Sequence, residues 1–392
     1  MEKNLMQDFD EVVERKNTNC IKYDAVKRYF KKDDVQPLWV ADMDFKTPKF
    51  IVEAIQKKVS QELYGYPEPH ISLFNSIENW MQKRHQWKIE TKDIMLLAGV
   101  VAGLSAAVEA FSEEEDEIIV QTPVYYPFFS VIKNNNRKLI ENPLRNDNGY
   151  YTMDLEDFKA KITPRTKMII LCSPHNPVGR VWDKKELESL ASICLKNNII
   201  IISDEIHSDL VYKKFIPMAS LSEEIANITL TLNSPSKTFN LAGLNSSYAI
   251  CSNRVMYQNF KRIVAKREIG SLNIFGIVAM QTAYESGESW VEKLLVYLNT
   301  NINFVENYLK KHDMKIEFIK PESTYLVWLN FKGYNFTHKE IQTKLLDNAK
   351  VALNDGLSFG SNANLYFRIN VALPKKELEQ ALQKIFLNLK PK

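Results

Sequence analysis

The stretch TKMIILCSPHNPVGRVWDKKELESLASICLKNNIIIISDE, residues 166–205, contains two apolar runs separated by a helical pattern. The runs, at 166–174 and 198–205, are rich in isoleucine, and each ends in polar residues. Continuous β-branched runs on either side of a helix are typical of parallel strands that are buried on both faces. The stretch therefore predicts a strand–helix–strand unit of an α/β fold.

Four further apolar runs extend this pattern in both directions along the chain. They lie at 93–99, 116–123, 228–236 and 247–252. Together the six runs predict an α/β fold with a mostly parallel central sheet and helices on both faces. A helix is also predicted over residues 47–60, with Thr47 as its N-cap.

The pattern changes after residue 283, which suggests a second unit. A long helical stretch at 290–313 is followed by strand-like runs at 323–331 and 365–373 and by a final helix from Pro374. We expect a small α+β domain at 284–392, a large domain at 47–283, and an N-terminal segment, 1–46, that packs with the small domain. No Gly/Ser-rich linker separates them, so tight packing is expected.

Composition and charge exclude several classes of protein. The chain has 392 residues, of which 45% are hydrophobic and 25% charged, values that are ordinary for a globular protein. The net charge of +3 and the absence of a basic run argue against nucleic-acid binding. No apolar run approaches the ~20 residues that span a bilayer, so no membrane segment is expected.

The cysteines and histidines indicate a reduced, metal-free protein. Cys20, Cys172, Cys194 and Cys251 are scattered and form no CxxC pair, and the N-terminus has no apolar signal region. We therefore expect reduced thiols and a cytoplasmic location. The six histidines form no HxH or HExxH cluster, so no dedicated metal site is predicted.

Polar clusters follow five of the predicted strands and point to one binding cleft. In an open parallel sheet, ligands bind at the carboxyl ends of the strands. Each cluster alone is compatible with a simple turn or a helix cap, but together they would build a single cleft. The clusters lie at 98–104, 122–128, 173–180, 203–210 and 234–239.

Two of these clusters are suited to a phosphate group. Gly99, Val100 and Val101 open a predicted helix, and backbone N–H groups at a helix N-terminus bind anions. Ser234 and Ser236 add hydroxyl groups. The sequence therefore predicts a phosphate site at this end of the cleft.

Three other side chains complete the pattern of a cofactor site. Tyr125 offers a flat ring, Asp204 follows four isoleucines and should be a buried acid that needs a cationic partner, and Lys237 lies sheltered among hydroxyls and small residues. A phosphate site, a flat ring, a buried acid and a sheltered lysine fit pyridoxal 5′-phosphate. In that chemistry the lysine binds the cofactor as a Schiff base, and the acid keeps the ring nitrogen protonated.

The chain also resembles a known family. Its motifs are similar to those of the pyridoxal-phosphate-dependent class I/II aminotransferases of fold type I and, within them, the MalY/PatB-type cystathionine β-lyases, which are C–S lyases. The resemblance covers nearly the whole chain. It rests on PLWVADMDFKTP, YGY, KRHQWKI, AGVVAGLSAAVEAF, TPVYYPFF, LCSPHNPVGRVW, SDEIHSDL, SKTFNLAGL and FRINVALP.

The resemblance implies roles for the residues around the cofactor ring. Lys237 would bind the cofactor and remove the α-proton of the substrate. Asp204 would pair with the ring nitrogen, Asn176 would donate to the ring hydroxyl oxygen, and Tyr125 would stack on the ring.

It also implies how the phosphate and the substrate are held. Val100 and Val101 would give backbone N–H groups to the phosphate, and Ser234 would add a hydroxyl. Tyr66 would reach the cofactor of a neighbouring subunit, which makes a homodimer with shared active sites part of the prediction.

A further pair of residues would hold the substrate. Arg368 would bind its carboxylate through the planar guanidinium, and Ala41 would offer backbone polarity to the same group. The resemblance thus implies a small-molecule substrate that is an amino acid.

Two positions depart from the pattern of many aminotransferases. His207 stands where they carry a tyrosine that donates to the ring oxygen, and Asn245 stands where they carry a phosphate-binding arginine. The lyase branch shares the sequence DEIH. A histidine can also donate, so a cofactor role for His207 stays open, as does the tightness of the phosphate site.

The resemblance implies a carbon–sulfur lyase activity. The expected reaction is α,β-elimination of L-cystathionine, L-cysteine or related S-substituted cysteines to a thiol, pyruvate and ammonia. An aminotransferase remains the nearer alternative because both reactions begin with removal of the same proton. A regulator that keeps this fold to bind a partner is the more distant alternative.

Overall fold

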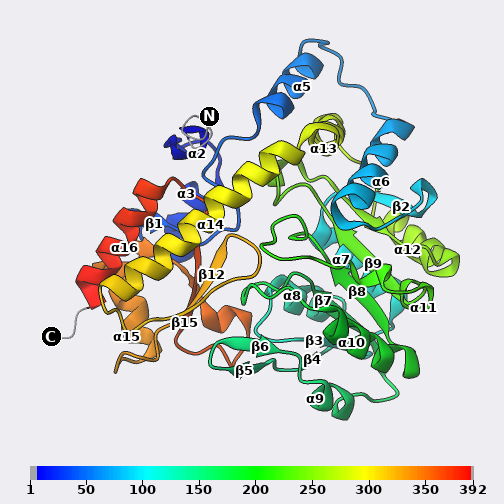
Figure 1. Ribbon diagram of the computed structural model, residues 1–392. Coiled ribbons are helices and arrows are strands. Elements are labelled where there is room, and N and C mark those ends of the chain that lie inside the picture. The colour runs from blue at the N-terminus through cyan, green and yellow to red at the C-terminus, as the bar shows by residue number, and fades with distance from the viewer. Residues whose placement is uncertain (1–6, 390–392) are drawn as a thin grey trace.

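A seven-stranded sheet forms the centre of the computed structural model, which describes residues 7–389 (Figure 1). The neighbouring strands follow the order β2–β10–β9–β8–β7–β3–β4. Their bounds are Ile94–Leu97 (β2), Ser247–Ile250 (β10), Thr229–Asn233 (β9), Ile200–Asp204 (β8), Thr166–Cys172 (β7), Glu117–Val120 (β3) and Lys138–Glu141 (β4).

The sheet is mostly parallel, as predicted. Strands β9, β8, β7, β3 and β4 are joined by parallel pairing, whereas β10 is antiparallel to both β9 and β2. All six apolar runs form strands, which confirms the predicted fold class. Because β10 runs the opposite way, its first residue lies at the edge where its neighbours end.

Alternate strand residues pack on opposite faces of the sheet, as the two-residue period of a strand requires. Ile118 and Val120 share a core with helices α7 (Val100–Phe111), α8 (Pro127–Asn134) and α12 (Arg254–Lys266). Ile119 packs instead with α10 (Lys184–Lys196). Helices therefore cover both faces, which explains why the inner strands are apolar over most of their length and do not alternate between apolar and polar residues.

The helix between β7 and β8 begins where its sequence provides a cap. Asp183 accepts a hydrogen bond from the backbone of Glu186, whose side chain in turn accepts one from the backbone of Asp183. This capping box satisfies two N–H groups at the start of α10. The other helices of this part are α5 (Lys49–Val59), α6 (Ile71–His85), α9 (Leu155–Ala160), α11 (Glu223–Ala226) and α13 (Ile274–Ser286).

A second, smaller sheet lies beside the first and belongs to the C-terminal part. Its order is β11 (Glu317–Ile319), β12 (Leu326–Asn330), β15 (Tyr366–Asn370), β14 (Asn354–Asp355). Helices α14 (Glu288–Lys311), α15 (His338–Thr343) and α16 (Lys375–Leu389) accompany it. In Figure 1 the long helix α14 (yellow) runs from the region of α13 to this smaller part.

The N-terminal segment lies against the small sheet region. Its helices are α2 (Gln7–Asp10), α3 (Ile21–Asp24) and α4 (Val26–Phe30), and its strand β1 (Gln36–Pro37) pairs in parallel with β13 (Val351–Ala352). The domain boundaries at residues 46 and 283 stay a prediction. Helix α5 begins at Lys49, and Thr47 donates to the carbonyl of Asn240 rather than capping it, so the predicted N-cap is wrong.

A β-hairpin formed by β5 (Arg145–Asp147) and β6 (Tyr150–Thr152) contacts the small sheet, since Asn146 donates to the Tyr366 hydroxyl at 3.0 Å and Tyr151 accepts from Trp328 Nε1 at 3.3 Å. Among residues 7–389, no helix is long and apolar enough to cross a membrane.

Candidate active site

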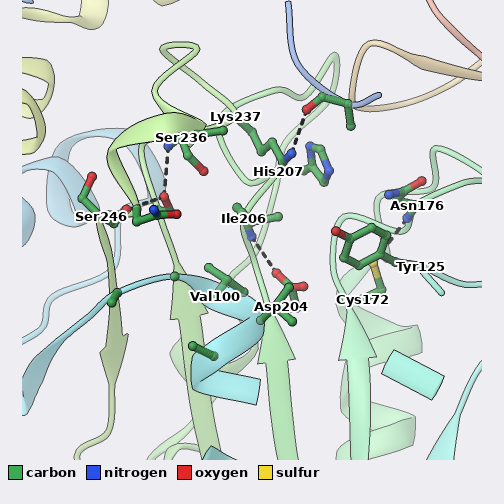
Figure 2. Close-up of a pocket in the computed structure, with 18 residues that line it drawn as sticks. Val100, Tyr125, Cys172, Asn176, Asp204, Ile206, His207, Ser236, Lys237 and Ser246 are labelled. Carbon is green, nitrogen blue, oxygen red and sulfur yellow. Dashed lines mark hydrogen bonds between the residues drawn. The ribbon is translucent and has the colours of Figure 1, made fainter. Parts of the chain in front are cut away.

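A cavity of about 370 Å³ opens at the carboxyl ends of the large sheet, where Figure 2 shows strands ending beneath the lining side chains. It brings together nine of the predicted site residues. They come from the loops after β2, β3, β7, β8 and β9 and from the N-terminal segment: Ala41, Val100, Val101, Tyr125, Asn176, Asp204, His207, Ser234 and Lys237. The five polar clusters therefore form one site.

Lys237 lies in the turn after β9, and its amine points into the cavity (Figure 2). Nζ donates a hydrogen bond to the carbonyl oxygen of Ala41 at 2.7 Å. Burial lowers the pKa of Lys237 to about 8, and the charge of Arg368 acts in the same direction. A minor but appreciable fraction of this amine is therefore neutral near physiological pH, and the neutral amine is the form that attacks a carbonyl or accepts a proton.

Asp204 ends β8 at the floor of the cavity and is 4% exposed. Burial raises its pKa to about 7. The one hydrogen bond that its carboxylate accepts among the described residues comes from the backbone N–H of Ile206 at 3.2 Å. Because a buried carboxylate is stabilised by a cation, this side chain is suited to a positively charged group of a ligand.

Arg368 lies on β15 and is 3% exposed; among the described residues its guanidinium donates hydrogen bonds to neutral oxygens and lies over the ring of Phe359, 4.9 Å from the centroid. Its guanidinium donates to Asn176 Oδ1 at 2.9 Å, to the carbonyl of Trp39 at 2.9 Å and to Asn354 Oδ1. Burial lowers the pKa of Arg368 to about 10, still well above neutrality. Arg368 does not itself line the cavity, but it is bonded to Asn176, which does. A positive charge without an anionic partner in the described chain therefore lies beside the cavity, as carboxylate binding requires.

Asn176 is held between this arginine and the strand below it. Its backbone N–H donates to Cys172 Sγ at 3.3 Å, and its side-chain oxygen accepts from Arg368. The amide nitrogen has no protein partner among the described residues. It is therefore free to donate to a ligand oxygen, and the predicted donation to the ring hydroxyl oxygen stays a prediction.

Tyr125 and His207 border the cavity from the loops after β3 and β8. Burial raises the pKa of the Tyr125 hydroxyl far above its ordinary value, so this group stays protonated. Burial lowers the pKa of His207 well below its ordinary value, with Lys237 and Arg368 acting in the same direction, so the ring is neutral. Its Nδ1 is buried without a partner in the described chain. These two rings thus bring no charge to the cavity.

The expected phosphate end is built around the start of α7. Gly99 precedes the helix with a φ of +131°, a conformation that favours glycine, and its N–H donates to Ser247 Oγ at 2.9 Å. Val100 and Val101 then present the first helical N–H groups to the cavity. No arginine lines the cavity within residues 7–389. An anion at this end would therefore be bound largely by the N–H groups at the start of α7.

The hydroxyl groups at this end differ from the prediction. Ser234 Oγ donates to the carbonyl of Ser246 at 2.7 Å and accepts from the N–H of Ser236 at 3.0 Å. Its proton is therefore directed at the protein backbone. The hydroxyl of Ser246 also faces this region, is buried, and has no partner in the described chain. Ser246 was missed because only the reversed direction of β10 brings it to this edge.

Of two further positions singled out in the sequence, Tyr66 lies apart from the cavity and Asn245 lines it. Tyr66, in the loop between α5 and α6, has a fully exposed side chain and does not line it. Asn245 does line it, with a φ of +47° in the left-handed region. Within the described residues, no group of three His, Cys, Asp or Glu side chains could hold a metal ion.

The donor set fits pyridoxal phosphate. Asp204 suits a protonated ring nitrogen, the amide of Asn176 suits a ring oxygen, and Lys237 suits the aldehyde carbon. The free hydroxyl of Ser246 and the start of α7 suit a phosphate. The cavity thus offers a matching group for each polar end of the cofactor.

Comparison with known proteins agrees with this chemistry. Residues 33–385 match the family model for aminotransferase class I and II. Cystathionine β-lyase PatB of Bacillus subtilis (strain 168) is 38% identical over 380 residues, covering 96% of this chain and 98% of that protein.

Two solved structures are similar over almost their whole length. Cystalysin of Treponema denticola, which contains pyridoxal 5′-phosphate, is 33% identical with a TM-score of 0.94, covering 97% of this chain and 98% of that one. A pyridoxal-phosphate-bound protein of Clostridium difficile 630, named provisionally as an aminotransferase, is 43% identical with a TM-score of 0.96, covering 97% and 99%. The chain therefore belongs to the class I and II aminotransferase family, and its cofactor is pyridoxal 5′-phosphate.

Proposed function

We propose that the protein is a carbon–sulfur β-lyase that converts L-cystathionine and related S-substituted cysteines to a thiol, pyruvate and ammonia. The observation that carries this proposal is a cavity lined by an amine of lowered pKa and a buried acid, with a guanidinium that has no carboxylate partner in the described chain held beside it through Asn176. Its relatives add support, since PatB and the Corynebacterium glutamicum protein, 38% and 31% identical, are both named cystathionine β-lyase.

Each of these groups has a separate task in the proposed reaction. Arg368 binds the carboxylate of the amino acid and so fixes the orientation of its α-carbon. The bound cofactor supplies a ring that accepts the electron pair left when the α-proton departs. Asp204 holds a proton at the nitrogen of that ring, which keeps the ring electron-poor.

Lys237 carries the proton transfers. Its neutral amine takes the α-proton, and Nζ then holds a proton close to the β-carbon of the substrate. The C–S bond breaks with its electron pair on sulfur, and the protonated amine of Lys237 is placed to protonate the departing thiolate. The hydrogen bond from Nζ to Ala41 gives the amine a defined resting position.

Ala41 is proposed to act on the substrate side of the cavity. Its carbonyl accepts from Lys237 and also from the hydroxyl of Tyr325 at 3.0 Å. We propose that its backbone also lines the carboxylate position, as predicted. Tyr125 is proposed to stack on the cofactor ring, and His207 to contact it as a neutral group.

The functional unit is proposed to be a homodimer. The loop between α5 and α6 exposes Leu63 by 77%, Tyr64 by 56% and Tyr66 by 106%, an unusual concentration of large apolar side chains. A second copy of the chain would cover this loop and receive Tyr66 at its own phosphate site, which lacks an arginine. Two equivalent shared sites would result from a two-fold axis.

A cytoplasmic location is also proposed. Its support is that all four cysteines are free thiols, with Cys172, Cys194 and Cys251 buried. Reduced, unpaired thiols are typical of proteins in a reducing compartment.

The decisive experiment supplies L-cystathionine to purified, cofactor-loaded protein without any keto acid. A β-lyase releases pyruvate, ammonia and homocysteine over many turnovers. An aminotransferase stops after about one turnover, because its cofactor is left in the amine form. Sustained turnover only with added 2-oxoglutarate, accompanied by glutamate, would favour the aminotransferase alternative instead. That alternative has its own support in more distant relatives, 28–29% identical, that are named aminotransferases.

A further inference from the structure

Three separate sequence motifs meet at one buried carboxylate behind the cavity. Asp209, of SDEIHSDL, accepts hydrogen bonds at Oδ1 from Trp80 Nε1 and His85 Nε2, each at 3.0 Å. At Oδ2 it accepts from the hydroxyl of Thr238, also at 3.0 Å. Trp80 and His85 lie on α6, whereas Thr238 directly follows Lys237 in SKTF. The carboxylate thus connects a helix to the turn that carries the lysine.

This carboxylate is anionic and closely enclosed. Asp209 is 3% exposed and Thr238 is fully buried. Burial by itself would raise the pKa of Asp209, but the hydrogen bond and charge of His85, together with the Arg84 guanidinium, bring it below its ordinary value. Arg84 Nε lies 3.4 Å from Oδ1, and the same side chain donates to Glu292 of α14 at 2.7 Å.

The turn that carries Lys237 is fixed on both sides of the lysine. Before it, Ser234 Oγ is bonded to the carbonyl of Ser246 at 2.7 Å. After it, Thr238 is bonded to Asp209, and the N–H of Phe239 donates to the carbonyl of Pro235 at 2.9 Å. The backbone of Lys237 is therefore held by hydrogen bonds on both sides, and its side chain extends into the cavity.

We propose that Asp209 is a positioning residue that fixes the Lys237 amine by holding the hydroxyl of Thr238. The inference rests on the proposed role of Lys237. A buried carboxylate loses its hydration and adds little net stability compared with apolar residues of the same volume. The carboxylate instead fixes the orientation of its neighbours, because a charged acceptor bonded to three converging donors permits only one arrangement of those donors.

The test compares Thr238→Val, which keeps the shape but removes the hydroxyl, with Thr238→Ser, which keeps the hydroxyl. In the loaded enzyme with L-cystathionine, kcat of Thr238→Val should fall by about 10- to 100-fold, as expected for misplacement of a reacting group. The KM should change much less, because Arg368 is untouched. Thr238→Ser should recover most of the lost rate.

A second measurement does not depend on turnover. Cofactor-free protein is mixed with pyridoxal phosphate, and samples are reduced with borohydride at increasing times. Lys237 Nζ condenses with the aldehyde with loss of one water, and borohydride delivers hydride to the resulting carbon, which leaves a stable secondary amine. Mass spectrometry of the peptide then gives the rate of attachment, which should be slower in Thr238→Val than in the wild type and in Thr238→Ser.

The outcomes separate this inference from the proposed function. Attachment at a lysine other than Lys237 would contradict the proposed function. Attachment at Lys237 with wild-type rate and wild-type kcat in Thr238→Val would overturn the inference alone. If Thr238→Val loses its folded structure in a melting experiment, Thr238→Ala, which removes the hydroxyl without adding bulk, is measured in the same two assays. Wild-type values there would likewise overturn it.

Discussion

The amine of Lys237 lies 2.7 Å from the carbonyl oxygen of Ala41, a residue 196 positions earlier in the chain. The Ala41 loop is itself held from two sides. Asn240 bonds to both backbone groups of Met43, and Asn370 donates to the carbonyl of Asp42 on one flank of Ala41. The resting place of the lysine is thus set jointly by the large sheet, the small sheet and the N-terminal segment.

Replacing Lys237 by alanine should abolish turnover while leaving the cofactor bound non-covalently. A well-placed base alone contributes about 10²–10⁴-fold, and this residue is also the covalent anchor. The rate of pyruvate release and the ability of gel filtration to strip the cofactor are the measurements. Lys266→Ala, at an exposed lysine paired with Glu109, is the control and should behave as the wild type. Full activity in Lys237→Ala would rule out the site.

Replacing Asp204 by asparagine should inactivate the enzyme and yet stabilise the cofactor-free protein at higher pH. The pKa of Asp204 is raised from 3.8 to about 7, so the folded state holds its proton more tightly than the unfolded state. The free energy of unfolding therefore falls as pH rises from about 4 to 7. By pH 8 this effect amounts to at most about 4 kcal/mol.

Urea unfolding of both cofactor-free proteins at pH 5 and pH 8 tests this linkage. The stability gained by Asp204→Asn should be larger at pH 8 than at pH 5. An equal gain at both values, or a loss at pH 8, would show that the carboxylate already has a cationic partner in the free protein.

Replacing Arg368 by lysine should raise KM for L-cystathionine without a matching change in kcat. The guanidinium bonds at once to Asn176, Trp39 and Asn354, and an ammonium group cannot reproduce that planar arrangement. Loss of a charged hydrogen bond of about 1.5–3 kcal/mol corresponds to a rise of roughly 10- to 100-fold. Steady-state kinetics measure it, and an unchanged KM would remove Arg368 from the substrate site.

Mixing two weakened variants should restore activity if the sites are shared between subunits. A Tyr66→Phe subunit paired with a Lys237→Ala subunit forms one site that has both native side chains. Random mixing should therefore give about a quarter of the wild-type rate, whereas each variant alone stays low. Light scattering should give the mass of a dimer; a fully active monomer is incompatible with the proposal.

Most of the large sheet could be predicted because most of its strands are marked by a local sequence pattern, a short apolar run. Each strand of β2, β3 and β7–β10 is a short apolar run, and chemistry-bearing side chains follow directly after it. The edge strand β4, Lys138–Glu141, was missed because its residues are only partly buried and it lacks a continuous apolar run. The direction of β10 was missed as well, since an apolar run is the same in either direction.

Residues whose partners are distant in the sequence were the hardest to predict. Ser246 reaches the site only because β10 is reversed. The bonds of Arg368 to Trp39 and Asn354 join three separate segments, and the contact of Asp209 with Thr238 joins two. Such contacts depend on how the sheets and loops pack against one another, and a local sequence pattern does not predict that packing. The presence of Lys237 and Asp204 in one cavity could be predicted because a sheltered lysine and a buried acid are unusual wherever they occur, and their roles stay a prediction.

The neutral surroundings of Arg368 have a consequence for the choice of substrate. The oxygens that accept from Arg368, on Asn176, Asn354 and Trp39, carry no charge, so the guanidinium has no anionic partner among them. In the proposed binding mode, the carboxylate of a free amino acid forms an ion pair with this guanidinium. An amide, ester or peptide at the same position has no negative charge to offer and must still give up its water. With Arg368 in its proposed role, we expect the protein to prefer a free cysteine derivative over the same residue inside a polypeptide because of charge, independently of size.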